Sequence, residues 1–370
     1  MTSTILMAAG FNPGILDSSV LLPRDVAALE VGVAALPALR TASGAEGRRL
    51  SLHLSRAPMC DPIEEQELFL ARVATFMGSD IQSVGVHLCG PLRDGMGRLG
   101  LGSGFSPTRE NRARACRFLE RLREVAGVPV LVENANLYPV DDSEFVGVGV
   151  FLRELIEARG FGLILDLAHL EMAAHNVGAS LDAALGTYPS AEVLHVSGYH
   201  RRGAWMHDGH DAAVAESTWM LLRQALSLSV CTQVVLEHTD PSWAARPEDL
   251  EREWARLRRE LEQRQAPEAF EPRPPEGGRA APDELAFAVG YLTRIVLPAR
   301  FPSLVEALGT ERFRALVRAW STEFLSSSTG HRLPFVHDGA LVADLADSVS
   351  VVQDFHGFAL RWSRGALDAR

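Results

Sequence analysis

The chain has 370 residues, a formal net charge of −11 and 47% hydrophobic residues, which is typical of a folded globular protein with room for more than one domain. The acidic balance disfavours a nucleic-acid-binding protein, because such proteins usually carry a basic surface. All 36 basic residues are Arg, which excludes the enzyme classes that need a reactive or phosphate-binding Lys: Schiff-base aldolases, pyridoxal-phosphate enzymes and Walker-A nucleotidases.

The first part of the chain alternates apolar runs with helical patterns. Helical periodicity predicts helices at 64–77, 144–159 and 247–264, and a further helix capped by Ser106 with Pro107 at its first position. Eight strand–helix units over about 260 residues match a (β/α)8 TIM barrel, and a doubly wound open sheet is the alternative. The open sheet is weaker because FNPGILD, after the first strand, is not a GxGxxG turn. The predicted strands are 4–9, 27–33, 50–54, 83–88, 129–133, 162–167, 192–197 and 233–238.

A different composition begins after the last predicted barrel helix. Residues 265–284 hold five prolines and a Gly pair, which predicts a linker. Beyond it, Ser303 and Glu306 have capping-box spacing, and a last helix is expected around 341–362. We therefore expect a barrel domain at 1–264, the linker at 265–284 and a small all-α domain at 285–370. Apolar residues at helical period, interpreted as core, are Phe313, Leu316, Val317, Trp320 and Phe324.

The cysteines and the apolar segments of a sequence indicate the compartment in which the protein folds. The four cysteines have no CxxC spacing and form no secreted disulfide pattern. No apolar stretch reaches the roughly 18 residues that a membrane span needs, and the N-terminal apolar run has no basic segment ahead of it. These features predict a cytoplasmic protein.

Six predicted strands end in a residue of a type that binds metals. A buried ionisable group is costly unless it is paired or bound to a metal, and strand ends in a barrel meet at one mouth. Imidazole and carboxylate without thiolate suit Fe, Zn or Mn. The number of groups exceeds the ligands of a single ion, so the pattern predicts two or three ions, with Glu133 as the bridging residue. The six residues are His53, His87, Glu133, Asp166, His195 and Glu237, and Asn134, His169, Asp208 and His210 lie between them in the sequence.

Taken singly, each of these residues has a simpler explanation. His53 and His87 could be hydrogen-bonded structural histidines, and Asp166 could cap the helix that follows it. The Asp208–His210 segment could be a solvated loop. His195 with Glu237 could form a catalytic dyad without any metal. The joint occurrence at strand ends favours the metal site.

In order and spacing, these motifs resemble those of the multinuclear non-haem iron-dependent oxidative enzymes (MNIO), a TIM-barrel family that modifies ribosomally made peptides. The resemblance covers roughly residues 1–260. The motifs that carry it are SLH at 51–53, HL at 87–88, LVENANLY at 131–138, LILDLAH at 163–169, LHVSG at 194–198, DGH at 208–210 and LEHTD at 236–240.

The resemblance implies two or three iron ions in mixed Fe2+ and Fe3+ states, with O2 as co-substrate. It implies that His53, His87 and Glu133 bind the first iron. A second iron would be held by Glu133, Asp166, His195 and Glu237. A third would take His169, Asp208 and His210 together with Asn134. Candidates for residues that support the ligands or transfer protons are Tyr199, His200 and His238.

The resemblance further implies a precursor peptide as the partner, modified at a Cys or an acidic side chain. The family typically works with a small helical protein that recruits this peptide, and FPSLVEALGTERFRALVRAW at 301–320 resembles such a protein. We therefore expect an oxidase fused to its recruiting domain, with no separate partner protein, no nucleic acid and no membrane. The alternatives are a zinc-dependent TIM-barrel hydrolase or isomerase, similar to AP endonucleases or xylose isomerase, and a non-catalytic peptide-binding scaffold.

Overall fold

The computed structural model describes residues 5–42, 47–92, 104–135, 142–202, 205–263 and 302–326. Eight parallel strands form a closed barrel in the order β1-β10-β7-β6-β5-β4-β3-β2. Because β1 (Leu6–Gly10) pairs with both β2 (Val26–Gly32) and β10 (Gln233–Leu236), the sheet has no edge, which rules out the open doubly wound alternative. The predicted TIM barrel is confirmed. The other strands are β3 (Arg49–Leu54), β4 (Ile81–His87), β5 (Val130–Glu133), β6 (Gly162–Asp166) and β7 (Val193–Val196).

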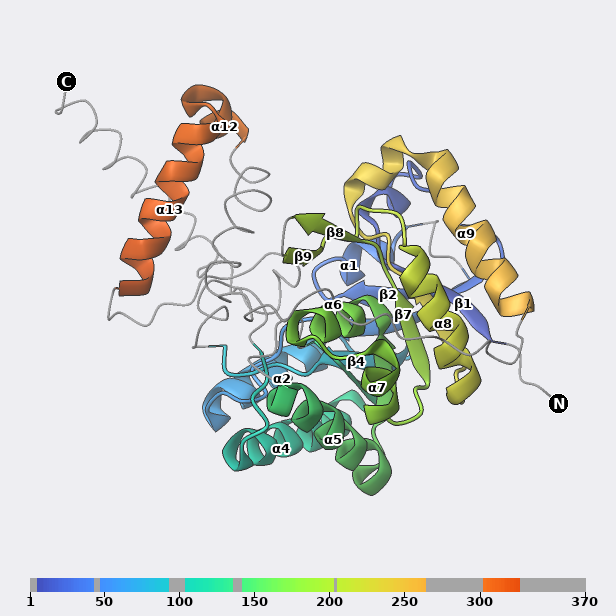
Figure 1. Ribbon diagram of the computed structural model, residues 1–370, viewed down its shortest axis with the longest axis vertical. Helices are drawn as coiled ribbons and strands as arrows, with labels where there is room; N and C mark the ends of the chain where they lie inside the picture. The colour runs from blue at the N-terminus through green and yellow to red at the C-terminus, as the bar shows by residue number, and fades with distance from the viewer. Residues whose placement is uncertain are drawn as a thin grey trace.

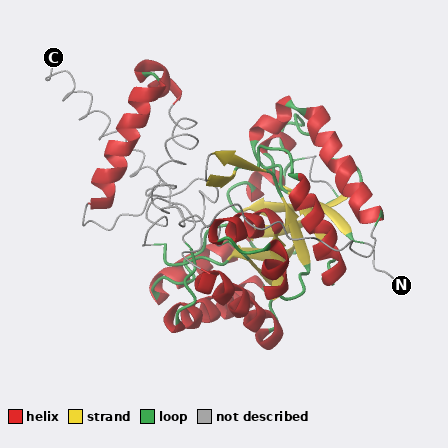
Figure 2. Cartoon of the chain, viewed as in Figure 1, coloured by secondary structure: helices red, strands yellow, loops and turns green. Residues whose placement is uncertain are grey.

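Helices surround the barrel, as Figure 1 and Figure 2 show. The predicted helices at 64–77, 144–159 and 247–264 are confirmed, with starts and ends that differ by a residue or two. In the last of them, Leu250, Trp254 and Leu257 recur at helical period and are buried, while Arg and Glu fill the opposite face. The helices around the barrel are α1 (Leu36–Leu39), α2 (Ile63–Phe76), α4 (Arg109–Ala126), α5 (Asp142–Arg159), α6 (Leu167–Val177), α7 (Leu181–Thr187), α8 (Glu216–Leu228) and α9 (Pro247–Glu262).

The predicted cap of α4 is wrong by two residues. The helix begins at Arg109, and its N-cap is Thr108, whose hydroxyl accepts a hydrogen bond from the backbone N–H of Asn111 at 3.2 Å. Ser106 instead donates its hydroxyl to the Glu144 carboxylate of α5 at 2.7 Å. Two hydroxyl residues stand close together here, and the one adjacent to the helical pattern forms the cap.

The two faces of the barrel strands differ in character. Outward residues such as Leu29 and Val31 of β2 belong to the large core between the strands and the helices. Alternation along the strand places Ala28 and Glu30 on the opposite, inner face. Ala28 packs with Ala8 and Val235 in a separate small cluster. Small residues therefore fill the lower barrel interior, and larger polar residues of the same strands lie nearer the C-terminal mouth.

Two elements lie outside the eight strand–helix units. A hairpin of β8 (Tyr199–Arg202) and β9 (Trp205–Asp208) follows β7, and the sequence analysis did not predict it. The second element is the pair of helices α12 (Pro302–Leu308) and α13 (Thr310–Ser326), which pack against each other. Since α12 begins at Pro302, Ser303 lies inside the helix and the predicted capping box is wrong.

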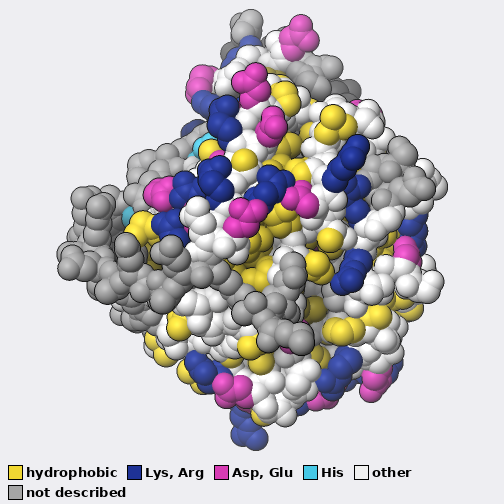
Figure 3. Space-filling model, turned by 90° about the vertical axis from the view of Figure 1, so that its right-hand side faces the viewer, with side chains coloured by type: hydrophobic (Ala, Val, Ile, Leu, Met, Phe, Trp, Pro, Cys, Tyr) yellow, Lys and Arg dark blue, Asp and Glu magenta, His cyan; other side chains and the backbone are white. Residues whose placement is uncertain are grey.

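Four of the apolar residues of α13 that were interpreted as core, Phe313, Leu316, Val317 and Trp320, are buried, and the side chain of Phe324 lies outside the described part of the chain. The predicted linker at 265–284 and the helix around 341–362 lie outside the described residues. Among the residues that the structure describes, no helix is long and apolar enough to cross a membrane. On the face drawn in Figure 3, Arg and acidic side chains are interleaved, so the charge of that face is mixed rather than basic.

Candidate metal centre

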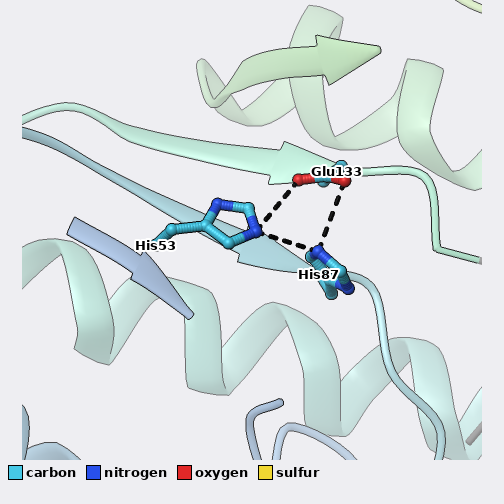
Figure 4. Close-up of side chains that lie close together, drawn as sticks. All are labelled: His53, His87 and Glu133. Atoms are coloured by element: carbon cyan, nitrogen blue, oxygen red, sulfur yellow. Dashed lines mark hydrogen bonds and ion pairs between the residues drawn. The ribbon is translucent and has the colours of Figure 1, made fainter. Parts of the chain in front are cut away.

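Three predicted ligands meet at the ends of three neighbouring strands. His53 of β3, His87 of β4 and Glu133 of β5 point toward one another across the barrel mouth (Figure 4). The Nε2 atoms of the two imidazoles are 2.9 Å apart, and each lies near one Glu133 oxygen, at 3.4 Å for His53 and 3.3 Å for His87. Two imidazole nitrogens and one carboxylate around a common point form a suitable set of ligands for a divalent transition metal.

Glu133 also belongs to a second group of candidate ligands. Glu133, Asp166 and His195 each offer a ligand atom within 4.8 Å of the others, and all three are buried. His195 Nδ1 lies 3.7 Å from Glu133 Oε2 and 3.4 Å from Glu237 Oε1, which brings the end of β10 to the same place. Because it faces both groups, Glu133 has the position of a bridging carboxylate.

A third group lies beside the first two, between α6 and the end of β9. His169 Nε2 lies 3.3 Å from Asp208 Oδ2, and His210 Nε2 lies 2.9 Å from the same oxygen. His169 Nδ1 is 3.4 Å from Glu133 Oε1, so this group adjoins the bridge. All the residues predicted as ligands therefore gather at one mouth, although their roles as ligands stay predictions.

Asn134 and Asp166 have structural roles of their own. Asn134 Oδ1 accepts the backbone N–H of Asp166 at 2.8 Å, and its Nδ2 donates to the Asp166 carbonyl at 2.9 Å. Asp166 Oδ1 caps α6 by accepting the backbone N–H of His169 at 2.7 Å. The capping alternative for Asp166 is thus correct, but its Oδ2 is buried without a hydrogen-bond partner and is free to bind a cation. Asn134 braces β5 against β6.

The chemistry of the donor atoms fits a metal. Burial without a hydrogen-bond partner is costly for a polar atom, and native structures contain few such atoms. Here several lie together: besides Asp166 Oδ2, they include Glu133 Oε2 and His195 Nδ1. Their residues, Glu133, Asp166 and His195, make up the second group, where a cation would satisfy these atoms.

Burial prevails in the pKa shifts of three residues of the cluster. Burial raises the pKa of Glu133 to about 7, against the opposing effect of His195 and His53, and it raises the pKa of Asp166 to about 6. Burial and the neighbouring imidazoles of His53 and His169 hold the pKa of His87 well below its usual value. Neutral imidazoles bind metals, and a bound cation would favour the charged form of both carboxylates.

One acidic residue of the cluster was not predicted. Glu30 of β2 is buried and lies 3.2 Å from both His53 Nδ1 and His195 Nε2. The predicted ligands stand at or after strand ends, whereas Glu30 stands in the middle of the apolar run AALEVGV. Glu30 could have been identified from the sequence as a carboxylate inside a buried apolar run, because such a group needs a polar or charged partner.

The predicted supporting residues have their contacts around the rim. Tyr199 donates its hydroxyl to Glu171 at 2.8 Å, and His200 Nε2 lies 2.5 Å from Asp211 Oδ1. The His238 ring stacks on the buried Trp243 with 3.9 Å between ring centroids. Their supporting role stays a prediction.

The third group depends on a tightly packed loop. His210 has a left-handed backbone with φ 52°, and Trp243 holds this conformation by donating its Nε1–H to the His210 carbonyl at 2.6 Å. Two residues after the end of β7, Gly198 has no room for a side chain, since a Cβ there would lie 1.9 Å from the Ala212 carbonyl oxygen. Both contacts fix the segment that carries His210.

Gly198→Ala is therefore expected to displace this loop and to weaken metal binding by the third group, while the other two groups keep their ions. The forced backbone shift should also cost about 1–3 kcal/mol of stability. Metal analysis and thermal unfolding measure the two effects. Gly186→Ala in α7 is the matched control, because nothing lies within 4 Å of its added Cβ. Equal behaviour of both variants would show that the loop does not depend on Gly198.

Comparisons with known proteins place the barrel among peptide-modifying enzymes. Residues 59–261 match the family described as "RiPP precursor modification enzyme MbnB/TglH/ChrH". A UPF0276 protein of Bordetella pertussis is 31% identical over 131 residues, covering 34% of this chain and 45% of the relative. Another, of Caulobacter sp. strain K31, is 30% identical over 141 residues, covering 37% of this chain and 51% of the relative. The match spans about half the length of these curated relatives.

Solved structures with a similar backbone fold have lower sequence identity to this chain than the curated relatives have. D-psicose 3-epimerase from Clostridium cellulolyticum H10 has a TM-score of 0.40 and 16% identity, covering 70% of this chain and 100% of that chain. An IolI protein with a zinc atom has a TM-score of 0.44 and 13% identity, with the same coverage of 70% and 100%. Likeness at this level carries no argument about activity.

Proposed function

Because this chain belongs to the MbnB/TglH/ChrH family of RiPP precursor modification enzymes, we propose that it uses iron and O2 to oxidise one side chain of a ribosomally synthesised precursor peptide. The observation that carries the proposal is the position of Glu133, whose two carboxylate oxygens face His87 and His169 on one side and His53 and His195 on the other. A carboxylate so placed suits a multinuclear centre.

We assign the proposed ligands to three sets. His53, His87 and Glu133 would hold one ion, and Glu133 with Asp166, His195 and Glu237 would hold a second. The third set is His169, Asp208 and His210, with Asn134 beside it. Bound iron would supply one-electron redox chemistry and open coordination positions for O2 and for the side chain to be oxidised.

The protein side chains control access to these ions. Glu133, Asp166 and His195 form a buried inner side, whereas His53, His87, Asp208 and His210 are only partly buried. A peptide would approach from this outer side, while the inner side excludes water. The substrate residue would be a Cys or an acidic side chain, since thiolate and carboxylate both bind iron.

Asp208 would also control the protonation of His210 at the outer side. When no ion is bound there, burial and the Asp208 carboxylate act in opposite directions on His210, and the carboxylate prevails, raising the pKa of His210 to about 10. The protonated His210 Nε2 then lies 2.9 Å from Asp208 Oδ2, which accepts its proton in a hydrogen bond. Binding of an ion at this group would release that proton.

The C-terminal residues 285–370 would recruit the peptide, joined to the barrel through residues 265–284. A tether of this kind raises the effective concentration of the bound peptide at the barrel mouth. The support for this role is the aromatic helix α13, together with the likeness of 301–320 to the helical recruiting proteins of the family.

The test is co-expression in air with a candidate precursor peptide, followed by mass spectrometry of the peptide. We expect an oxygen-dependent mass change that is lost in His87→Ala and in Asp208→Ala. Glu260→Gln is the control, because Glu260 is a buried carboxylate on α9 that pairs with Arg223 and Arg256, outside the barrel. Zinc in place of iron, with no oxygen requirement, would instead indicate a hydrolase or isomerase.

A further inference from the structure

Glu30 is a buried carboxylate that the proposed set of ligands does not use. It stands in the middle of β2 between the buried residues Leu29 and Val31, which face the outer core. Alternation turns the Glu30 side chain into the barrel, above Ala28. Since a carboxylate in this position is costly without a partner, its contacts indicate why it is tolerated.

A single oxygen of Glu30 faces two imidazoles from different metal groups. Oε1 lies 3.2 Å from His53 Nδ1 and 3.2 Å from His195 Nε2. The opposite nitrogen of each ring faces the bridging carboxylate, with His53 Nε2 at 3.4 Å and His195 Nδ1 at 3.7 Å from Glu133 Oε2. Each ring thus lies between Glu30 and Glu133.

The space for this arrangement is built into neighbouring strands. On β4, a Cβ at Gly85 would lie 3.0 Å from His53 Nδ1 and 2.6 Å from the Cδ1 atom of Ile164. Gly85 therefore leaves room for the His53 ring to keep Nδ1 toward Glu30. The rings of His53 and His195 are tilted against each other with centroids 5.6 Å apart, which lets both reach one oxygen.

We propose that Glu30 is a positioning residue that fixes the tautomers of His53 and His195 and so couples the first two metal groups. A neutral imidazole that binds a metal through one nitrogen carries its proton on the other, and a carboxylate beside that N–H orients the ring. Both facing nitrogens, His53 Nδ1 and His195 Nε2, are buried without a hydrogen bond, and a small rotation of each ring would let Glu30 accept their protons. This inference rests on the proposed multinuclear centre and adds a residue to its support.

An alternative role for Glu30 is that of a direct ligand. Glu30, His195 and Glu237 also offer atoms within 4.8 Å of one another. In that arrangement His195 would bind through Nε2, and the contact between Glu30 and His53 would have no function. The two roles predict different results when Glu30 is replaced. Loss of a shared acceptor weakens the binding of two ions, whereas loss of a ligand weakens the binding of one.

The experiment compares Glu30→Leu and Glu30→Gln in the full chain, loaded with Fe2+ under anaerobic conditions. Leu removes both the charge and the acceptor, and we expect both of the first two ions to bind about 10–100-fold more weakly, measured by chelator competition. Gln keeps an acceptor oxygen, so it should restore part of the affinity at both positions. Mössbauer spectra should report changes at two iron environments, and Glu260→Gln should match the unaltered protein.

A measurement on the unaltered chain avoids dependence on variants that fail to fold. In protein loaded with diamagnetic Zn2+ and labelled with 15N-histidine, the proposal predicts the proton of His53 on Nδ1 and that of His195 on Nε2. The opposite tautomers would overturn it, as would unchanged affinities in Glu30→Leu. Weaker binding of one ion alone would overturn the shared role and assign Glu30 as a ligand. If the unaltered chain binds no iron, the proposed function itself fails, and this measurement comes first.

Discussion

Glu133→Gln is expected to remove iron from the first two groups together and to lower the rate of peptide modification by at least about 100-fold, since a lost bridging ligand affects both ions. The amide keeps the size of the side chain but removes the charge between His53, His87 and His195. Elemental analysis after anaerobic Fe2+ loading measures the iron content, and mass spectrometry of the peptide measures the rate.

The control for this variant is Glu237→Gln, which removes a carboxylate beside His195 and His210 and leaves the first group complete. We expect Glu237→Gln to lose one ion and to keep the iron beside His53 and His87. Circular dichroism should show an intact barrel in both variants, because burial already raises the pKa of Glu133 to about 7 and the neutral form is tolerated without metal. Equal iron content in the two variants would contradict a bridge at Glu133.

Deletion of residues 285–370 is expected to leave the iron content intact and to reduce peptide modification by about 100-fold or more at low peptide concentration. The reason is that a tethered recruiting domain supplies a high local concentration of peptide, which is lost when the tether is cut. The rate should recover as the peptide concentration is raised, because the barrel mouth is unchanged. Rates over a range of peptide concentrations test this.

A fall in the rate that no peptide concentration restores would contradict the recruiting role. Loss of iron or of the barrel fold on deletion would contradict it as well, since these outcomes assign a structural role to the segment. Trp320→Ala is a matched variant within the full chain, because it removes a buried indole from α13 and leaves the barrel sequence unchanged. It should reproduce the effect of the deletion on the rate without altering the iron content.

The barrel was predictable because its strands are buried on both faces and its polar residues fall at strand ends. Runs such as VLVE and GLILD are almost wholly buried, so each appears in the sequence as an uninterrupted apolar segment that stops at a ligand-type residue. Parallel strands place those stops at one mouth, which predicted the meeting of His53, His87 and Glu133.

The unpredicted features have physical reasons. Glu30 stands inside a strand, and only the radial geometry of a closed barrel brings it under two imidazoles from other strands. The β8–β9 hairpin carries Tyr, His and Arg on short strands without an apolar run, so no hydrophobic period marks it. The brace between Asn134 and the Asp166 backbone depends on the pairing of β5 with β6, which the sequence of either strand does not contain.

Crystals of anaerobically purified protein, measured on both sides of the iron absorption edge, test the multinuclear centre most directly. We predict anomalous iron peaks on two sides of the Glu133 carboxylate, one beside His53 and His87 and the other beside Asp166 and His195. A zinc signal alone, a single peak, or iron bound away from the barrel mouth would contradict a multinuclear iron centre at this place.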